Sequence, residues 1–206
     1  MISAEELEQL TPKQRARRQR VIETAIALAA AGGYEAVQMR EVATSADVAL
    51  GTIYRYFSSK DHLLAAAMAD MTGGLQERVV EHPPKGETMA DQLVDVYRRA
   101  TRALERQPRL TAALVTALSS PDAGVEASAT LIRGNVAAMT GGILEPLDPE
   151  LRDGIIGVIG HVFYSTLTAW AHGRHSFNHI MKELEKAIRL LLAPYETAGN
   201  GRRKPR

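Results

Sequence analysis

Apolar residues recur at helical spacing along almost the whole of this 206-residue chain, and strand signals are nearly absent. Residues 21–29 and 64–79 each contain a continuous apolar stripe, and similar stripes follow at 89–104 and 177–191. A chain of this length also has ample material for a buried core. The pattern predicts an all-α fold with about nine helices.

The first sixty residues contain clear helix boundaries. Thr11-Pro12 predicts the start of a helix, because proline at an early position loses no helical hydrogen bond, and Gly32-Gly33 predicts its end. Short helices are expected over residues 39–45 and about 49–57, joined by a tight turn at 46–48. Two short helices joined in this way outline a helix-turn-helix.

The rest of the chain divides at "EHPPKGE" (81–87), a loop sequence that is the clearest interruption. Further helices are expected to begin near Met89, Pro108, Ser120, Asp148 and Phe177. The predicted organisation is a flexible arm over 1–11, a helix-turn-helix domain over 12–60, a larger helical domain over 61–195 and a disordered basic tail over 196–206.

The charge is unevenly distributed. Residues 12–60 contain eight Lys or Arg and four Asp or Glu, whereas residues 61–200 contain thirteen and seventeen. A basic N-terminal unit favours a polyanionic partner. The chain has no cysteine, and residues 65–195 show no nucleophile–base pair and no carboxylate pair spaced for acid–base catalysis, so an enzyme is not expected.

Residues 154–173 contain no Asp, Glu, Lys or Arg and are long enough to span a membrane. The segment nevertheless contains four glycines, two histidines and several hydroxyl residues, and no second span exists. We therefore expect a buried helix. The acidic residues Glu5, Glu6 and Glu8 do not fit a secretory signal, and a cytoplasmic protein is expected.

"LGTIYRYFSSK" (50–60) concentrates scarce aromatic residues in the second short helix. Gly51 permits close approach to DNA, Thr52 offers a hydroxyl and a methyl group, and Arg55 can reach a guanine edge or a phosphate. Tyr54 and Tyr56 present hydroxyls suited to phosphates, and Phe57 anchors the helix. The alternative is that the aromatic cluster is ordinary core and the basic first helix a solvated surface.

Residues 32–64, "GGYEAVQMREVATSADVALGTIYRYFSSKDHLL", closely resemble the DNA-binding domain of the TetR family of transcriptional regulators. The resemblance implies that Gly51 and Thr52 lie at the bases. The full set expected to contact DNA is Arg40, Thr44, Leu50, Gly51, Thr52, Tyr54, Arg55, Tyr56 and Lys60. The chain departs from the family pattern at Gln38 and Ala49, where a hydroxyl residue is usual, so each short helix should begin without a side-chain cap.

The resemblance is greatest to the branch of that family that regulates steroid catabolism. It implies a repressor that a small apolar effector releases, an acyl-CoA or steroid-CoA thioester being the candidate class, bound inside the bundle over 61–195. The expected lining is Met68, Met71, Tyr97, Leu104, Leu114, Met139, Phe163, Leu167 and Trp170. Such residues at helical spacing equally fit a plain core.

Four arginines fall on what the spacing makes one helix face: Arg98, Arg102, Arg106 and Arg109. They form either a solvated stripe or, as the resemblance implies, a site for the phosphates of coenzyme A.

The last two helices of TetR-like proteins form a homodimer interface, which would present two recognition helices to a palindromic operator. Gly154, Gly157 and Gly160 recur every three residues and would allow close helix packing. The expected interface residues are Gly157, Gly160, Tyr164, Ile180, Leu184 and Ile188.

Two further features leave alternatives open. His172, His175 and His179 resemble a metal cluster, but Gly173 and Ser176 favour a loop and a helix start, so no metal or cofactor is expected. Gly73-Gly74 is either a hinge or a helix break.

The alternative function is that of a ligand-binding or helical interaction protein without a specific DNA target.

Overall fold

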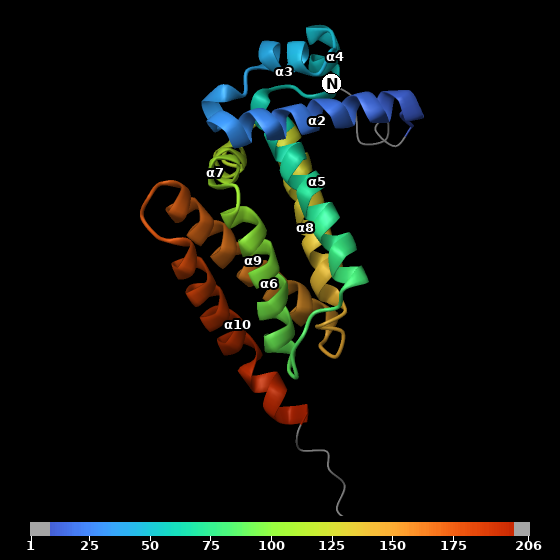
Figure 1. The fold of residues 1–206 in the computed structure, drawn as a ribbon. Helices are drawn as coiled ribbons and strands as arrows, with labels where there is room; N and C mark the ends of the chain where they lie inside the picture. The colour runs from blue at the N-terminus through green and yellow to red at the C-terminus, as the bar shows by residue number, and fades with distance from the viewer. Residues whose placement is uncertain (1–8, 200–206) are drawn as a thin grey trace, which may run out of the picture. The chain divides into compact units, whose positions relative to one another are not determined.

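The computed structural model describes residues 9–199, which form nine α-helices, one 3-10 helix and no strand (Figure 1). The all-α prediction is confirmed. The helices are α2 (Pro12–Gly32), α3 (Met39–Ser45), α4 (Leu50–Tyr56), α5 (Lys60–Glu81), α6 (Met89–Glu105), α7 (Pro108–Ala117), α8 (Ala123–Gly141), α9 (Pro149–Ala171) and α10 (Phe177–Gly199), with the 3-10 helix η1 at Tyr34–Ala36.

These helices form two compact units. The first contains residues 9–73 and 107–133, and the second contains residues 74–106 and 134–199. The chain passes between the units within α5, between α6 and α7, and within α8. The first unit thus includes α7 and the start of α8, which follow the predicted boundary at residue 60 in the sequence. The domain boundaries at residues 60 and 195 stay a prediction.

In the first unit, α2 begins at a reciprocal cap. The Thr11 amide donates to Oε1 of Gln14 at 2.8 Å, and the Gln14 amide donates to Oγ1 of Thr11 at 3.3 Å. The helix ends at Gly33, whose φ of 74° is accessible to glycine at little cost. The turn between α3 and α4 contains Asp47 with φ of 52°, a conformation that aspartate tolerates better than most residues.

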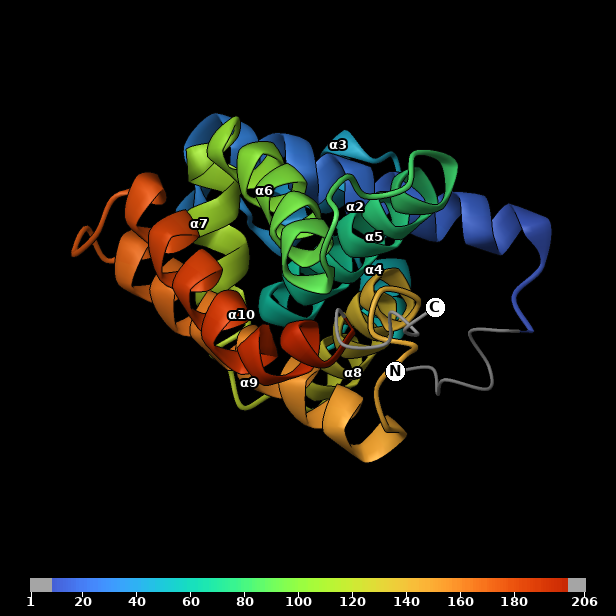
Figure 2. The ribbon, with the colours of Figure 1, turned by 90° about the horizontal axis from the view of Figure 1, so that it is seen from below.

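In the second unit, α10 packs against both α6 and α9 (Figures 1 and 2). Its apolar stripe, Ile180, Leu184 and Ile188, is completely buried against residues of the same chain. These three residues therefore belong to the core of the protomer, and their prediction as dimer contacts is wrong. A stripe repeating every four residues covers one helix face, and that face is already occupied by α6 and α9.

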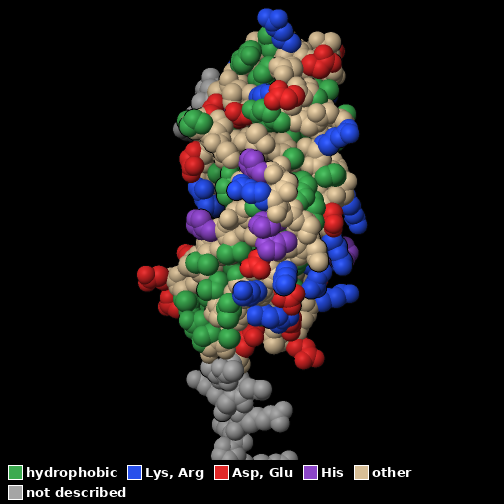
Figure 3. All heavy atoms as spheres, turned by 90° about the vertical axis from the view of Figure 1, so that its left-hand side faces the viewer, with side chains coloured by type: hydrophobic (Ala, Val, Ile, Leu, Met, Phe, Trp, Pro, Cys, Tyr) green, Lys and Arg blue, Asp and Glu red, His purple; other side chains and the backbone are tan. Residues whose placement is uncertain are grey.

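Helix α9 is not the buried helix that its uncharged sequence suggested. Only 17% of the most apolar stretch of this helix is buried, and Val158 and Tyr164 are exposed. Figure 3 looks onto the side that carries α10 and shows hydrophobic side chains and histidines at the surface. Within the described residues, α9 is the one helix that is long and apolar enough to span a membrane by length and composition.

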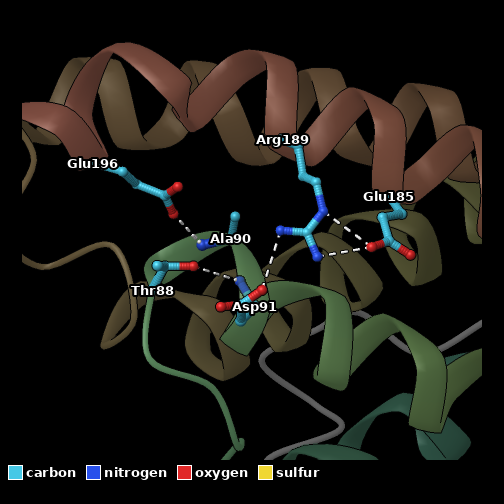
Figure 4. Close-up of polar contacts among 6 residues, drawn as sticks. All are labelled: Thr88, Ala90, Asp91, Glu185, Arg189 and Glu196. Atoms are coloured by element: carbon cyan, nitrogen blue, oxygen red, sulfur yellow. Dashed lines mark hydrogen bonds and ion pairs between the residues drawn. The ribbon is translucent and has the colours of Figure 1, made fainter.

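Polar contacts fix the start of α6 to α10 (Figure 4). Oγ1 of Thr88 accepts from the Asp91 amide at 3.1 Å, and the Glu196 carboxylate accepts from the Ala90 amide at 2.8 Å. Arg189 donates to Asp91 at 3.1 Å and to Glu185 at 2.7 Å. The hydrogen bond from Thr88, followed by that from Arg189, lowers the pKa of Asp91. Two amides at the start of α6 that lack a partner within the helix are thus satisfied, one by the preceding residue Thr88 and one by Glu196 of α10.

Two other expectations need correction or limitation. Gly73-Gly74 does not break a helix, since α5 continues through it to Glu81. The start of the predicted disordered tail is helical, because α10 reaches Gly199. The rest of that tail, and most of the arm predicted over 1–11, lie outside the described residues.

Candidate nucleic-acid interface

The helix-turn-helix presents one open face, formed by α3 and α4 (Figure 1). Arg40, Thr44, Gly51, Tyr54 and Arg55 are exposed on these two helices. Between them lies a depression of about 600 Å³. Its lining consists of Arg40, Ala43, Thr44, Asp47, Val48, Ala49 and Leu50. The depression thus brings three of the predicted residues, Arg40, Thr44 and Leu50, to one surface.

Both helices begin without side-chain caps, as Gln38 and Ala49 predicted. The side-chain amide of Gln38 instead donates to the Glu35 carbonyl at 3.0 Å. In α4 the first helical bonds run from Thr52 and Ile53 back to the Ala49 carbonyl. Because no side chain caps the start of α4, the position of Leu50 and Gly51 depends on buried residues at the other end of the helix.

The anchor of α4 lies at its C-terminal end and consists of Ile53, Tyr56 and Phe57. Phe57 and Ile53 are completely buried, and the guanidinium of Arg18 lies 5.1 Å from the centre of the Phe57 ring. Burial lowers the pKa of Arg18, which therefore acts as a packing residue of the first unit. The basic start of α2 contributes fewer free cations than its composition suggests.

The two tyrosines of α4 have different roles. Tyr54 is 47% exposed, whereas Tyr56 is 2% exposed and its hydroxyl accepts from Nη2 of Arg55 at 3.1 Å. The expectation that both hydroxyls face outward is wrong for Tyr56. Position 56 follows Ile53 by three residues, so its side chain points to the same buried face.

Arg55 and Lys60 have partners within the first unit. The Arg55 guanidinium lies 5.1 Å from the centre of the Tyr56 ring. The Lys60 ammonium lies 3.7 Å from the centre of the Tyr34 ring and 3.8 Å from the Glu35 carboxylate. Tyr34 in turn donates to Asp61, and burial together with this hydrogen bond raises its pKa to about 12. Both cations are held near the C-terminal end of α4 rather than freely extended.

Comparisons with known proteins agree with this geometry. The profile of the bacterial regulatory proteins, tetR family, matches residues 21–67, and the Tetracyclin repressor-like, C-terminal domain matches residues 86–191. The HTH-type transcriptional repressor KstR of Rhodococcus jostii is 39% identical over 197 residues, covering 93% of this chain and 87% of that repressor. The chain belongs to the TetR family. KstR belongs to the branch of the family, regulators of steroid catabolism, to which residues 32–64 showed the greatest resemblance.

Solved structures show the same fold. A TetR transcriptional regulator from Rhodococcus sp. RHA1 has a TM-score of 0.76 and 30% identity, covering 87% of this chain and 97% of that one. Thermus thermophilus FadR in complex with lauroyl-CoA has a TM-score of 0.69 and 23% identity, covering 85% and 93%. Membership of the TetR family implies a DNA-binding regulator with a non-enzymatic role.

The residues predicted to line an effector site are divided between the units. Met68, Met71 and Leu114 lie in the first unit, and the other six lie in the second. Within the second unit, the Tyr97 and Phe163 rings meet edge to face at 5.5 Å. Tyr97 is buried, which raises its pKa, and Trp170 packs on Phe177 at 4.2 Å. The lining set stays a prediction.

The four arginines do not share one helix. Arg98 and Arg102 lie one turn apart on α6, Arg106 follows the end of that helix, and Arg109 is on α7. Arg109 donates to the Ala31 carbonyl at 2.7 Å within the first unit. Pro108 starts a new helix and so interrupts the spacing on which the stripe was based.

Of the predicted interface residues, Gly157 and Tyr164 are exposed and Gly160 is half-buried. Val158 and Leu190, which the sequence did not mark as interface candidates, are also exposed. Leu190 follows the buried Ile188 by two residues and so lies outside the buried apolar stripe of α10. An apolar residue at such a position could have indicated an exposed apolar surface from the sequence alone. His175 and His179 stack at 4.1 Å, but the described residues contain no group of three potential metal ligands.

The contrast between the two tyrosines predicts different effects on stability. Tyr56→Ala should lower the free energy of unfolding by about 3–5 kcal/mol, because it removes a fully buried aromatic ring. Tyr54→Ala, the same substitution two residues earlier, should change it by no more than about 0.5 kcal/mol. Urea denaturation of both variants measures the difference. A loss for Tyr56→Ala as small as that expected for Tyr54→Ala would show that Tyr56 is not part of the core.

Proposed function

We propose that the protein is a homodimeric TetR-family repressor in the cytoplasm, which binds a palindromic operator and is released by an apolar effector. The exposed surface of α3 and α4 is the observation that supports this proposal most directly. It combines small, hydroxyl-bearing and cationic side chains on a two-helix element whose aromatic anchor is buried. The relative named as a transcriptional repressor supports repression rather than activation.

Gly51 is the residue that most favours contact with DNA. It lies in the first turn of α4, where glycine is a poorer helix former than alanine. A Cβ atom added at Gly51 would meet nothing within 4 Å, so the packing of the chain does not require glycine there. A requirement for close approach by a partner explains the residue. Tyr54, Arg40 and Thr44 lie on the same surface and offer phosphate contacts.

The exposed apolar face of α9 supports a dimer. Val158 is 48% exposed and lies with Gly154 and Leu191 in a groove between α9 and α10. Gly154 and Gly157 expose backbone that a helix of a second copy could approach closely, since nothing lies within 4 Å of an added Cβ. Symmetric pairing through this face would present two copies of α4 to two half-sites.

The effector proposal rests on the family and on α6. Thermus thermophilus FadR binds lauroyl-CoA, and we propose a coenzyme A thioester with an apolar acyl or steroid group for this chain. Tyr97 and Phe163 supply an apolar lining within the second unit. Arg98 and Arg102 are the candidates for the phosphates, whereas Arg109 is already held by a backbone carbonyl.

The DNA proposal is tested with duplexes from the region upstream of the protein's own gene. Wild type should bind one of them selectively, with affinity that falls as salt rises. Gly51→Ala should raise thermal stability through helix propensity and yet weaken operator binding at least about tenfold, a loss of about 1.4 kcal/mol. Fluorescence anisotropy and thermal melts measure the two effects.

Gly134→Ala provides the control, since Gly134 is an exposed helical glycine whose added Cβ also meets nothing within 4 Å. It should leave operator affinity unchanged. Operator binding by Gly51→Ala at wild-type strength would argue against close approach at position 51. A wild-type protein indifferent to every upstream fragment would refute the DNA proposal.

The dimer is tested by placing a charge on α9. Val158→Glu should yield monomers at micromolar concentration, because the carboxylate would be buried without a partner in the interface. Sedimentation velocity measures the state. Val80→Glu is the matched control, since Val80 is 73% exposed near the end of α5, and it should remain dimeric. Monomeric wild type, or dimeric Val158→Glu, would contradict this interface.

The effector class is tested by adding acyl-CoA and steroid-CoA thioesters to the operator complex. Arg98→Ala and Arg102→Ala should each require roughly tenfold more thioester for release, through loss of a charge-assisted contact. Arg109→Ala should respond as wild type. If no thioester releases the wild type, the ligand class is wrong; if it does and all three variants respond normally, the arginine assignment is wrong.

A further inference from the structure

One carboxylate, that of Asp122 at the start of α8, forms hydrogen bonds to the loop that follows α4. Asp122 accepts from Oγ of Ser58 at 2.8 and 2.9 Å, through both carboxylate oxygens, and from Oγ of Ser59 at 2.8 Å. It also accepts from the Gly124 amide at 2.7 Å. Ser58 and Ser59 follow Phe57 directly, so this carboxylate holds the chain where α4 passes into α5.

The hydrogen bonds to Asp122 are strong enough to affect its ionisation. Partial burial alone would raise the pKa of this carboxyl, but the hydrogen bonds from Ser59, Ser58 and the Gly124 amide, together with the nearby His62, lower the pKa overall. Asp122 is therefore charged at neutral pH. Charge-assisted hydrogen bonds of this kind are shorter and stronger than neutral ones.

A second contact joins the same two segments through His62. The Ser58 amide donates to Nδ1 of His62 at 3.2 Å, and the His62 ring meets the Phe57 ring edge to face at 5.4 Å. Gly124 lies against the same imidazole, where an added Cβ would be 2.3 Å from Nδ1. Burial lowers the pKa of His62, so the ring stays neutral at neutral pH.

We propose that Asp122 and Gly124 are positioning residues for DNA recognition: through Ser58, Ser59 and His62 they fix the anchored end of α4 and so the orientation of its exposed face. All five residues belong to the first unit. Neither Asp122 nor Gly124 lies on α3 or α4, and both act through other residues. This inference rests on the proposed DNA binding.

Two substitutions test this positioning role. For each of them, the expected effect on operator binding is opposite to the effect that charge or helix propensity alone would have. Asp122→Asn removes a negative charge, which by electrostatics alone should strengthen DNA binding. Gly124→Ala adds helix propensity, which by itself should stabilise α8. We expect both variants to bind the operator about tenfold more weakly than wild type, while their affinity for a scrambled duplex of the same composition changes less than twofold.

The matched controls are Asp70→Asn and Gly134→Ala. Asp70 is an exposed carboxylate of the same unit that accepts from Gln19 at 3.1 Å, and Gly134 lies in the same helix as Gly124 with open space around it. Both controls should bind the operator at least as tightly as wild type. All five proteins are compared by anisotropy with the two duplexes, and by thermal melts to confirm folding at the assay temperature.

Equal weakening toward both duplexes would indicate general loss of structure and would overturn the positioning role, as would unchanged operator affinity in both variants. If Asp122→Asn unfolds, Gly124→Ala and Ser58→Ala decide, and selective loss of operator affinity is again required. Failure of wild type to bind any operator would instead refute the proposed function, which keeps the two conclusions separate.

Discussion

The burial of Phe57 and Tyr56 is the interaction on which the proposed DNA-binding surface depends. Helix α4 has seven residues and no side-chain cap, and a helix of that length is not stable alone in water. It persists because its last turn inserts two aromatic rings and Ile53 into the core of the first unit. Since one face is committed to the core in this way, the opposite face, with Gly51 and Tyr54, must be exposed. The exposed surface is thus a direct consequence of where the helix is anchored.

The local sequence predicted where helices begin and end, but it did not predict which of their faces are buried. The cap at Thr11, the glycine at position 33 and the prolines at 108 and 149 act within one turn, so the sequence alone determines them. Which face of a helix is covered depends on neighbours distant in the chain. Ile188 and Leu190 are both apolar, yet α6 and α9 cover only the first. The same reason explains Tyr56, whose hydroxyl suggested an exposed role although its ring fills the core.

Charge composition likewise overstated the number of cations free to meet DNA. Arg18 packs on Phe57, and Lys60 and Arg55 lie over tyrosine rings of the same unit. Held cations cost less conformational entropy on binding than free ones, so a few fixed contacts can position the protein on DNA. The excess positive charge of residues 12–60 would then act mainly on the rate of encounter. Composition indicated a polyanionic partner. Only the contacts distinguish the cations that would speed the encounter with DNA from those that would hold the protein in one position on it.

The glycines show how structural and functional constraints can be separated in a single chain. At Gly124 the imidazole of His62 occupies the space that a side chain would need, so the fold itself demands glycine. At Gly51 the fold makes no such demand, although glycine weakens a helix that is already short. A destabilising residue without an internal cause points to a requirement from outside the chain. Gly51 lies on the exposed face of α4, and we therefore propose that this requirement is the close approach of DNA.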